Sequence, residues 1–182
     1  IYSPESRAYF NAIDYMIEEE KMAVIIQEVI GNEHNGRYYP EISGVAQSYN
    51  FYPFSYIQPE DGFAVTAIGL GAYVVGGEKT HRFSPAYPKL QLASTQDKIK
   101  ASQRYFYGVN MLAQDYDLYR DGENAAIKAY DISEAERDGT LEYTASVYDF
   151  MNDQITYDFS VKGPRIVDFS KILQYDYFPL AP

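Results

Sequence analysis

Hydrophobic and polar residues change their spacing along the chain, and each spacing predicts an element of structure. Apolar residues recur at helical intervals over residues 4–19, which predicts an amphipathic helix. An apolar run rich in β-branched residues follows over residues 22–30 and is closed by Gly31. A short run of this kind that ends at a glycine is typical of a buried strand, so we predict a strand here.

The residues after this run predict a tight turn and a returning strand. Asn35 and Gly36 both tolerate the positive φ that a hairpin turn requires. Residues 37–51 then return as one or two strands. We therefore expect residues 22–30 to pair antiparallel with the segment 42–48.

Shorter apolar runs, separated by proline and glycine, predict the elements in the middle of the chain. They are a loop over 51–62, a strand over 63–70, a helical turn over 72–75, a strand over 80–83, a break at 85–88, a surface helix over 94–107, a strand over 125–130 and a short helix over 133–136 that ends at Gly139.

The clearest period-two alternation lies between residues 141 and 161. It predicts a β-hairpin joined at Asn152-Asp153, with one face buried. The side chains expected on that face are Tyr143, Val147, Ile155 and Phe159. A last edge strand is expected over residues 164–169.

Composition narrows the class of protein. The net charge is −11, and phosphate-backbone binding needs clustered Lys and Arg, so we expect no nucleic-acid partner. The chain has no Cys, which excludes disulfides and thiolate metal sites. It shows no signal-peptide pattern and no apolar stretch near the roughly 20 residues that span a bilayer. We therefore expect a cytoplasmic protein without a membrane partner.

Tyrosine is the most distinctive residue type, with 20 Tyr and no Trp. Tyr suits half-buried strand positions where its hydroxyl stays hydrated, and this is the simpler interpretation. A surface on which carbohydrate stacks is the alternative.

Three blocks in order resemble the nucleotide-binding domain of the phosphoenolpyruvate synthase and pyruvate phosphate dikinase family, a branch of the ATP-grasp proteins. Ile25-Ile26-Gln27-Glu28-Val29-Ile30 resembles the family strand Val-x-Val-Gln-x-Met-Val. Ser43-Gly44-Val45-Ala46-Gln47-Ser48 resembles its Ser-Gly-Val-x-Phe-Thr segment. The segment 69–77 resembles Gly-Leu-Gly-Glu-x-Val-Val-x-Gly, and Arg7-Ala8 resembles the start of an upstream family helix.

The resemblance implies an α+β fold, an ATP-grasp-like subdomain with a mostly antiparallel sheet and flanking helices. It also implies that the strand end offers backbone groups to adenine, which makes Gln27, Glu28, Val29 and Ile30 candidate nucleotide-binding residues. A core strand that simply turns out to solvent is the alternative interpretation of these residues.

Phosphate binding is expected at two further places. Gly69 and Gly71 lack the Cβ that would keep backbone N–H groups from a phosphate, although a plain tight turn has the same sequence. Arg82, or Lys79, could donate to phosphate from the following strand, or be an ordinary solvated charge. A Walker-type phosphate loop is excluded, because Gly77 stands where that motif requires Lys.

The resemblance implies Mg²⁺ together with ATP, but the chain departs from the family at a metal-binding position. The glutamate that follows Gly-Leu-Gly in the family is Ala72 here, so the metal ligands are not identified. His34 and His81, the two histidines, lack the Thr-Gly-Gly-x-x-x-His context of the family's phospho-carrier. We expect no catalytic residue in this chain.

Taken together, the sequence predicts part of a larger phosphotransferase. Residues 1–174 would form a partial nucleotide-binding domain and 175–182 the start of a linker. In the family, ATP phosphorylates a His in another domain, which passes the phosphoryl group to pyruvate. The partners expected for this chain are therefore ATP and the phospho-His and pyruvate-binding domains of the parent. The alternative is a non-catalytic, Tyr-rich binding or scaffold module derived from such a domain.

Overall fold

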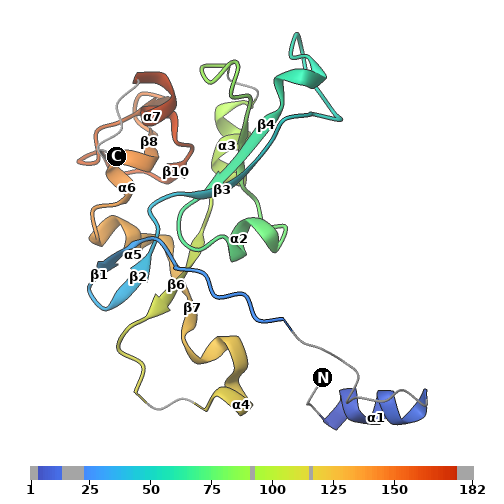
Figure 1. Ribbon diagram of the computed structural model, residues 1–182. Coiled ribbons are helices and arrows are strands. Elements are labelled where there is room, and N and C mark those ends of the chain that lie inside the picture. Colours follow the sequence, from blue (N-terminus) through green and yellow to red (C-terminus); the bar gives the residue numbers. More distant parts are fainter. Residues whose placement is uncertain (1–3, 14–22, 91–92, 115–116, 176–182) are drawn as a thin grey trace.

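The computed structural model describes residues 4–13, 23–90, 93–114 and 117–175, and within them it is a mixture of short helices and antiparallel strands (Figure 1). The α-helices are α1 (Pro4–Ala12), α2 (Ala72–Val75), α3 (Thr95–Ala101), α4 (Leu118–Asp121), α5 (Ile132–Arg137), α6 (Leu141–Thr144) and α7 (Ser170–Tyr175), with 3-10 turns at Pro59–Asp61 and Gly122–Ala125. The strands are β1 (Asn32–His34), β2 (Arg37–Tyr39), β3 (Ser43–Gln47), β4 (Phe63–Ala67), β5 (His81–Phe83), β6 (Tyr105–Asn110), β7 (Ile127–Asp131), β8 (Ala145–Asp149), β9 (Gln154–Thr156) and β10 (Arg165–Val167).

The strands form three antiparallel sheets, in the orders β1-β2-β6-β7, β3-β4-β5 and β10-β8-β9. The expected combination of helices with a mostly antiparallel sheet is thereby confirmed. No described helix is long and apolar enough to cross a membrane.

The core lies where the three sheets and two of the short helices meet. Tyr39 of β2 packs on Phe106 of β6, with their ring centres 4.5 Å apart. The buried side chains of this cluster are Tyr39, Ile68, Phe106, Ala135, Leu141, Ala145, Val167 and Phe169. In Figure 1, α1 lies away from this body, and it has no buried residue.

Several predicted elements are confirmed. Asn35 and Gly36 have φ of 51° and 78° and join β1 to β2 as a two-residue hairpin turn. The helical turn expected at 72–75 is α2, and the expected strands at 63–70, 80–83 and 125–130 are β4, β5 and β7. The short helix expected before Gly139 is α5.

The predicted pairing of residues 22–30 with 42–48 is wrong. β3 pairs instead with β4, in a register that sets Ser43 opposite Ala67 and Gln47 opposite Phe63. The turn at Asn35-Gly36 joins only the short strands β1 and β2, so the returning chain reaches a different sheet. The apolar pattern correctly predicted a strand at β3, but it could not predict which strand β3 would pair with.

The alternating segment forms a shorter hairpin than predicted. Leu141–Thr144 is the helix α6, and only β8 and β9 pair, with Val147 opposite Thr156. Leu141 and Thr144 are buried, which fits a helix because residues three apart share one face. Of the predicted inward set, Val147 is buried, whereas Tyr143, Ile155 and Phe159 are half-buried.

Three other predicted boundaries shift. α1 ends at Ala12, and most of the remaining part of the expected helix lies outside the described residues. The helix expected over 94–107 ends at Ala101, because β6 begins at Tyr105. The edge strand expected at 164–169 is β10, and the expected linker lies outside the described residues apart from Tyr175, which ends α7.

Candidate functional site

The segment predicted to contact adenine is not a strand in the structure. Residues 23–30 have no regular secondary structure and are exposed throughout. Ile26 has 91% of its surface exposed, and Val29 has 49%. The backbone carbonyl of Val29 accepts a hydrogen bond of 2.9 Å from the Tyr38 hydroxyl. The predicted strand is therefore wrong, because no neighbouring strand pairs with this run.

Gly69 is held by close contact with the neighbouring strand. Its φ is +88°, and a Cβ at this position would lie 2.6 Å from the carbonyl oxygen of Tyr107. The Gly69 N–H donates to Pro40 O at 3.1 Å, and the Leu70 N–H donates to Tyr107 O at 2.8 Å. Both N–H groups are thus used within the fold, which favours a packing role for Gly69.

Gly71 differs from Gly69 in its surroundings. It is exposed, it precedes α2 with a φ of −57°, and a Cβ there would meet nothing within 4 Å. The conformation of Gly71 therefore does not require a glycine.

Arg82 lies on β5 and is exposed. Its guanidinium lies 3.8 Å from the ring centre of Phe63, and its Nη2 donates to Asn50 Oδ1 at 2.8 Å. These contacts hold the cation beside an aromatic face. Lys79 is also exposed and precedes the same strand.

A cavity of about 180 Å³ lies between β5, α3, β10 and α7, and Arg82 is part of its lining. His81 and Asp168 also face it. Burial lowers the pKa of His81, against the opposing influence of Asp168, so the imidazole is neutral at pH 7. The Asp168 carboxylate is itself satisfied by the hydroxyls of Ser146 and Ser170, at 2.9 and 2.7 Å.

The structure does not bring the predicted nucleotide-binding residues together in this cavity. Arg82 belongs to its described lining, whereas residues 27–30, Gly69 and Gly71 do not. Asp168 and Lys98 also line the cavity, but they were not predicted from the sequence. No local pattern could have identified them, because they reach the cavity only through the packing of distant segments.

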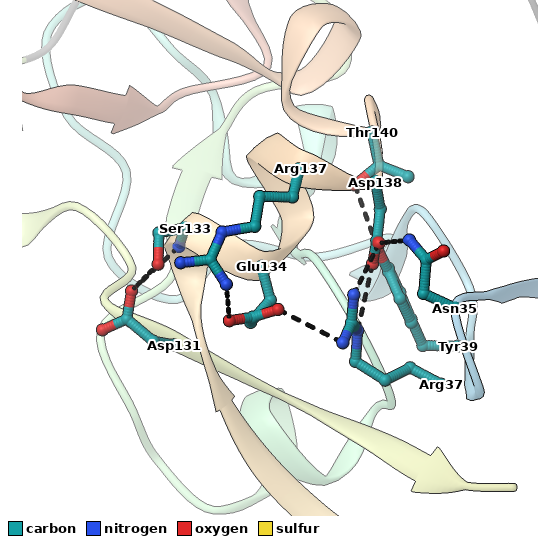
Figure 2. Close-up of polar contacts among 9 residues, drawn as sticks. All are labelled: Asn35, Arg37, Tyr39, Asp131, Ser133, Glu134, Arg137, Asp138 and Thr140. Atoms are coloured by element: carbon teal, nitrogen blue, oxygen red, sulfur yellow. Dashed lines mark hydrogen bonds and ion pairs between the residues drawn. The ribbon is translucent and has the colours of Figure 1, made fainter.

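A buried carboxylate fixes the β1–β2 hairpin, which directly follows the exposed segment (Figure 2). Asp138 accepts hydrogen bonds from Asn35 Nδ2 at 2.9 Å, from Arg37 Nη2 at 2.6 Å and from the Tyr39 hydroxyl at 2.9 Å. Glu134 of α5 adds an ion pair of 3.2 Å with Arg37.

Two arginines face the two carboxylates of this cluster, because Arg137 of α5 also pairs with Glu134. Burial opposes ionisation of Asp138, but the hydrogen bonds from Arg37, Asn35 and Tyr39 outweigh it and lower the pKa of Asp138. Burial raises the pKa of Tyr39, which therefore stays protonated and donates. Since all of these polar groups have partners inside the fold, the cluster positions the hairpin and leaves little capacity for a ligand.

The described residues do not fit a magnesium site near Gly69. They contain no group of three or more His, Cys, Asp or Glu side chains that could hold a metal ion. Ala72 begins α2 where the family pattern has an acid, and it offers no oxygen ligand from its side chain.

Comparison with known proteins identifies the family. No curated protein and no solved structure matches the chain. The family model described as the pyruvate phosphate dikinase AMP/ATP-binding domain matches residues 1–147. This agrees with the resemblance found in the sequence. The chain therefore belongs to the family of pyruvate phosphate dikinase AMP/ATP-binding domains.

Proposed function

We propose that this chain is the ATP-binding part of a larger phosphotransferase similar to phosphoenolpyruvate synthase. The family match over residues 1–147 carries the proposal. In the proposed reaction, ATP phosphorylates a His in another domain, and that His transfers the phosphoryl group to pyruvate. The fold would be one side of an ATP-grasp, with its boundary near residue 174.

The exposure of residues 23–30 supports a nucleotide site that is completed by another part of the parent protein. Val24, Ile25 and Ile26 are each at least 79% exposed, and they lead directly into Gln27 and Glu28. Aliphatic side chains in such a row are typical of a surface that another part of a protein covers. We propose that adenine binds along residues 27–30, between this segment and that second part.

The structure supports the remaining candidate phosphate-binding residues unequally. Arg82 is exposed and held by Phe63 and Asn50, which suits a phosphate donor. Gly71 has open space around it, whereas the N–H of Gly69 already has a partner. The ligands of Mg²⁺ would come from the second part of the protein, since the residues near Gly69 do not fit the ion.

Calorimetric titration of the chain with Mg-ATP tests the proposal, alongside transfer of labelled phosphate. A site with only one side should bind ATP more weakly than about 1 μM, which corresponds to about −8 kcal/mol. We also expect no hydrolysis and no label on His34 or His81, because the donors and water-excluding wall of the second side are missing.

A double variant tests the position of the adenine site. Gln27→Ala with Val29→Ala should abolish the weak binding, whereas Met151→Ala, a change at an exposed apolar residue of the β8–β9 turn, should leave it unchanged. Binding that survives the double change would show that adenine binds elsewhere. Complete absence of ATP binding in the unmodified chain would favour the second candidate function, a non-catalytic Tyr-rich binding module. The exposed aromatic side chains at residues 49–56 support that candidate.

A further inference from the structure

The cavity between β5, α3, β10 and α7 lies on the face of the β3-β4-β5 sheet opposite to the Arg82 guanidinium. Successive residues of a strand point to opposite faces, so His81 and Phe83 share one face and Arg82 takes the other. The guanidinium stacks on Phe63, whereas Phe169, just before α7, packs near the His81 ring with 6.1 Å between the ring centres. β10 and α7 therefore cover the His81 face, and the candidate phosphate donor points away from the cavity.

One wall of this cavity lies beyond the residues that the family model matches. The match ends at residue 147, whereas Asp168, Ser170 and Leu173 all contribute to the lining. None of residues 27–30, along which adenine binding is proposed, belongs to the described lining. A ligand in the cavity would therefore occupy a place separate from the proposed nucleotide site.

The size and lining of the cavity suit a small aliphatic group. Its volume is about 180 Å³, and a dry apolar cavity of about 150 Å³ is large enough for benzene. Phe83, Leu90, Ile166 and Leu173 supply its large apolar side chains. Phe83 and Leu173 also line a neighbouring apolar depression together with Ile172, so the apolar surface continues beyond the cavity.

Asp168 gives one side of the cavity a negative charge. Its side chain is only 2% exposed, and Oδ2 accepts hydrogen bonds from the hydroxyls of Ser146 and Ser170. Within the described part of the chain, Oδ1 accepts only the Ser170 N–H, at 3.2 Å, and Asp168 forms no ion pair. Because a carboxylate accepts about four hydrogen bonds, Asp168 has capacity for one further donor, and an ammonium group would also supply its counter-charge.

Lys98 of α3 brings a positive charge to the same cavity. Burial lowers the pKa of His81, the charge of Asp168 raises it, and the charge of Lys98 lowers it. Asp168 and Lys98 therefore both lie near this neutral imidazole. The other carboxylate of the described lining, Asp97, is exposed and accepts a hydrogen bond of 2.7 Å from the hydroxyl that caps α3. The cavity thus offers one buried anion and one cation beside an apolar wall.

We propose that this cavity binds a small α-amino acid with an aliphatic side chain, such as leucine or valine. The ligand ammonium group donates to Asp168, the ligand carboxylate accepts from Lys98, and the side chain packs against Phe83 and Leu173. An aliphatic acid or an aliphatic amine carries only one of these charges and leaves the opposite protein group without a partner. The amino acid has no net charge, so the net charge of −11 does not repel it.

Chemical-shift titration of the ¹⁵N-labelled full chain with L-leucine tests the proposal. Two analogues serve as controls: isocaproate, which lacks the ammonium group, and isoamylamine, which lacks the carboxylate. We expect leucine to shift the backbone amide signals of Ala101 and Val167, which line the cavity, but not that of Met151 at the β8–β9 turn. Each analogue should bind at least about tenfold more weakly, because it loses a charge-assisted hydrogen bond. Absence of the shifts at Ala101 and Val167, or equal affinity for all three compounds, overturns the proposal.

A pair of lysine variants tests where the ligand carboxylate lies. In Lys98→Gln, leucine should lose its preference over isoamylamine but keep its preference over isocaproate, since Asp168 still accepts from the ammonium group. Lys100→Gln changes an exposed lysine of the same helix that is not part of the described lining, and it should keep both preferences. A preference over isoamylamine that survives Lys98→Gln, or that Lys100→Gln also removes, contradicts the proposed contact.

Competition with Mg-ATP separates this site from the proposed nucleotide site. Because the two sites are distinct, Mg-ATP should not reverse the leucine-induced shifts at Ala101 and Val167. Reversal of these shifts would show that the cavity is part of the nucleotide site, and it would overturn the proposal. Failure of the chain to bind ATP contradicts the proposed function alone, because the leucine titration does not depend on it.

Discussion

Asp138 shows how one residue joins two parts of the fold. Its carboxylate has no exposed surface, and three side chains of the β1–β2 hairpin donate hydrogen bonds to it. Arg37, its main partner, keeps 15% of its side-chain surface exposed. A buried ion pair of this kind need not stabilise more than an apolar contact would, but removing one partner leaves the other uncompensated.

We therefore expect Asp138→Ala to lower the free energy of unfolding by about 3–5 kcal/mol. Asp121→Ala is the control, because its partner Arg120 is 70% exposed, and it should cost less than about 1 kcal/mol. Urea denaturation at pH 7 measures both. Equal losses would show that the Asp138 cluster contributes no more than a surface pair.

Because the pKa of Asp138 is shifted, the stability loss caused by Asp138→Ala should depend on pH. Its folded-state pKa is lowered, so its contribution is complete above the unfolded value of about 3.9 and is lost as the pH falls through the folded value. The stability difference between the unmodified chain and Asp138→Ala should therefore shrink below about pH 4. Denaturation curves from pH 7 to pH 2.5 check this, and a difference that stays constant would contradict it.

Gly69 and Gly71 provide a matched pair at the residue scale. Gly69→Ala places a Cβ at a φ of +88° and 2.6 Å from Tyr107 O, so it should destabilise by at least about 1–3 kcal/mol. Gly71→Ala meets nothing within 4 Å and has a helical φ, so it should be neutral or stabilise by about 0.4–1 kcal/mol. Thermal unfolding separates the two. Equal effects would mean that close packing is not the reason for Gly69.

At the scale of elements, turn chemistry predicted structure better than apolar pattern did. Asn35-Gly36 specified a hairpin because few residue pairs tolerate two positive φ values. The run at 22–30 has strand-like residues, but β-propensity expresses packing against neighbouring strands, and no strand pairs with its described part, residues 23–30. Arg82 was a candidate because it is a cation on the strand that follows the Gly-rich segment, whereas Asp168 joins the cavity only through tertiary packing.

The segment 141–161 allows a quantitative test of alternation against helical spacing. Leu141 is fully buried on α6, so Leu141→Ala should cost about 2–5 kcal/mol. Phe159 is half-buried, packs partly on the core and lies under Arg165, with 5.1 Å from guanidinium to ring centre. Phe159→Ala should cost about 2 kcal/mol, less than a core phenylalanine. Urea denaturation compares them, and a larger loss for Phe159 would favour the long hairpin expected from alternation.

At the scale of the whole molecule, apolar surface is unevenly distributed. The body buries a compact aromatic and aliphatic cluster, whereas residues 24–30 and the loop 48–62 leave large side chains in solvent. A net charge of −11 opposes association of the molecule through self-repulsion. The segment 24–27, Val-Ile-Ile-Gln, is uncharged, and its first three residues are β-branched, which is typical of segments that associate as strands.

Ile26→Asp tests whether this segment controls self-association. Because Ile26 is 91% exposed, the change should alter the free energy of unfolding by no more than about 0.5 kcal/mol. It places a charge in the middle of the uncharged run, so concentration-dependent association should decrease. Met151→Asp is the matched control, since Met151 is also 91% exposed and lies at the β8–β9 turn. Sedimentation velocity over a range of concentrations measures both variants. If Met151→Asp reduces association as much as Ile26→Asp does, added charge alone explains the effect. If neither variant reduces association, residues 24–30 are not an associating surface, which would also speak against their being covered by another part of the protein.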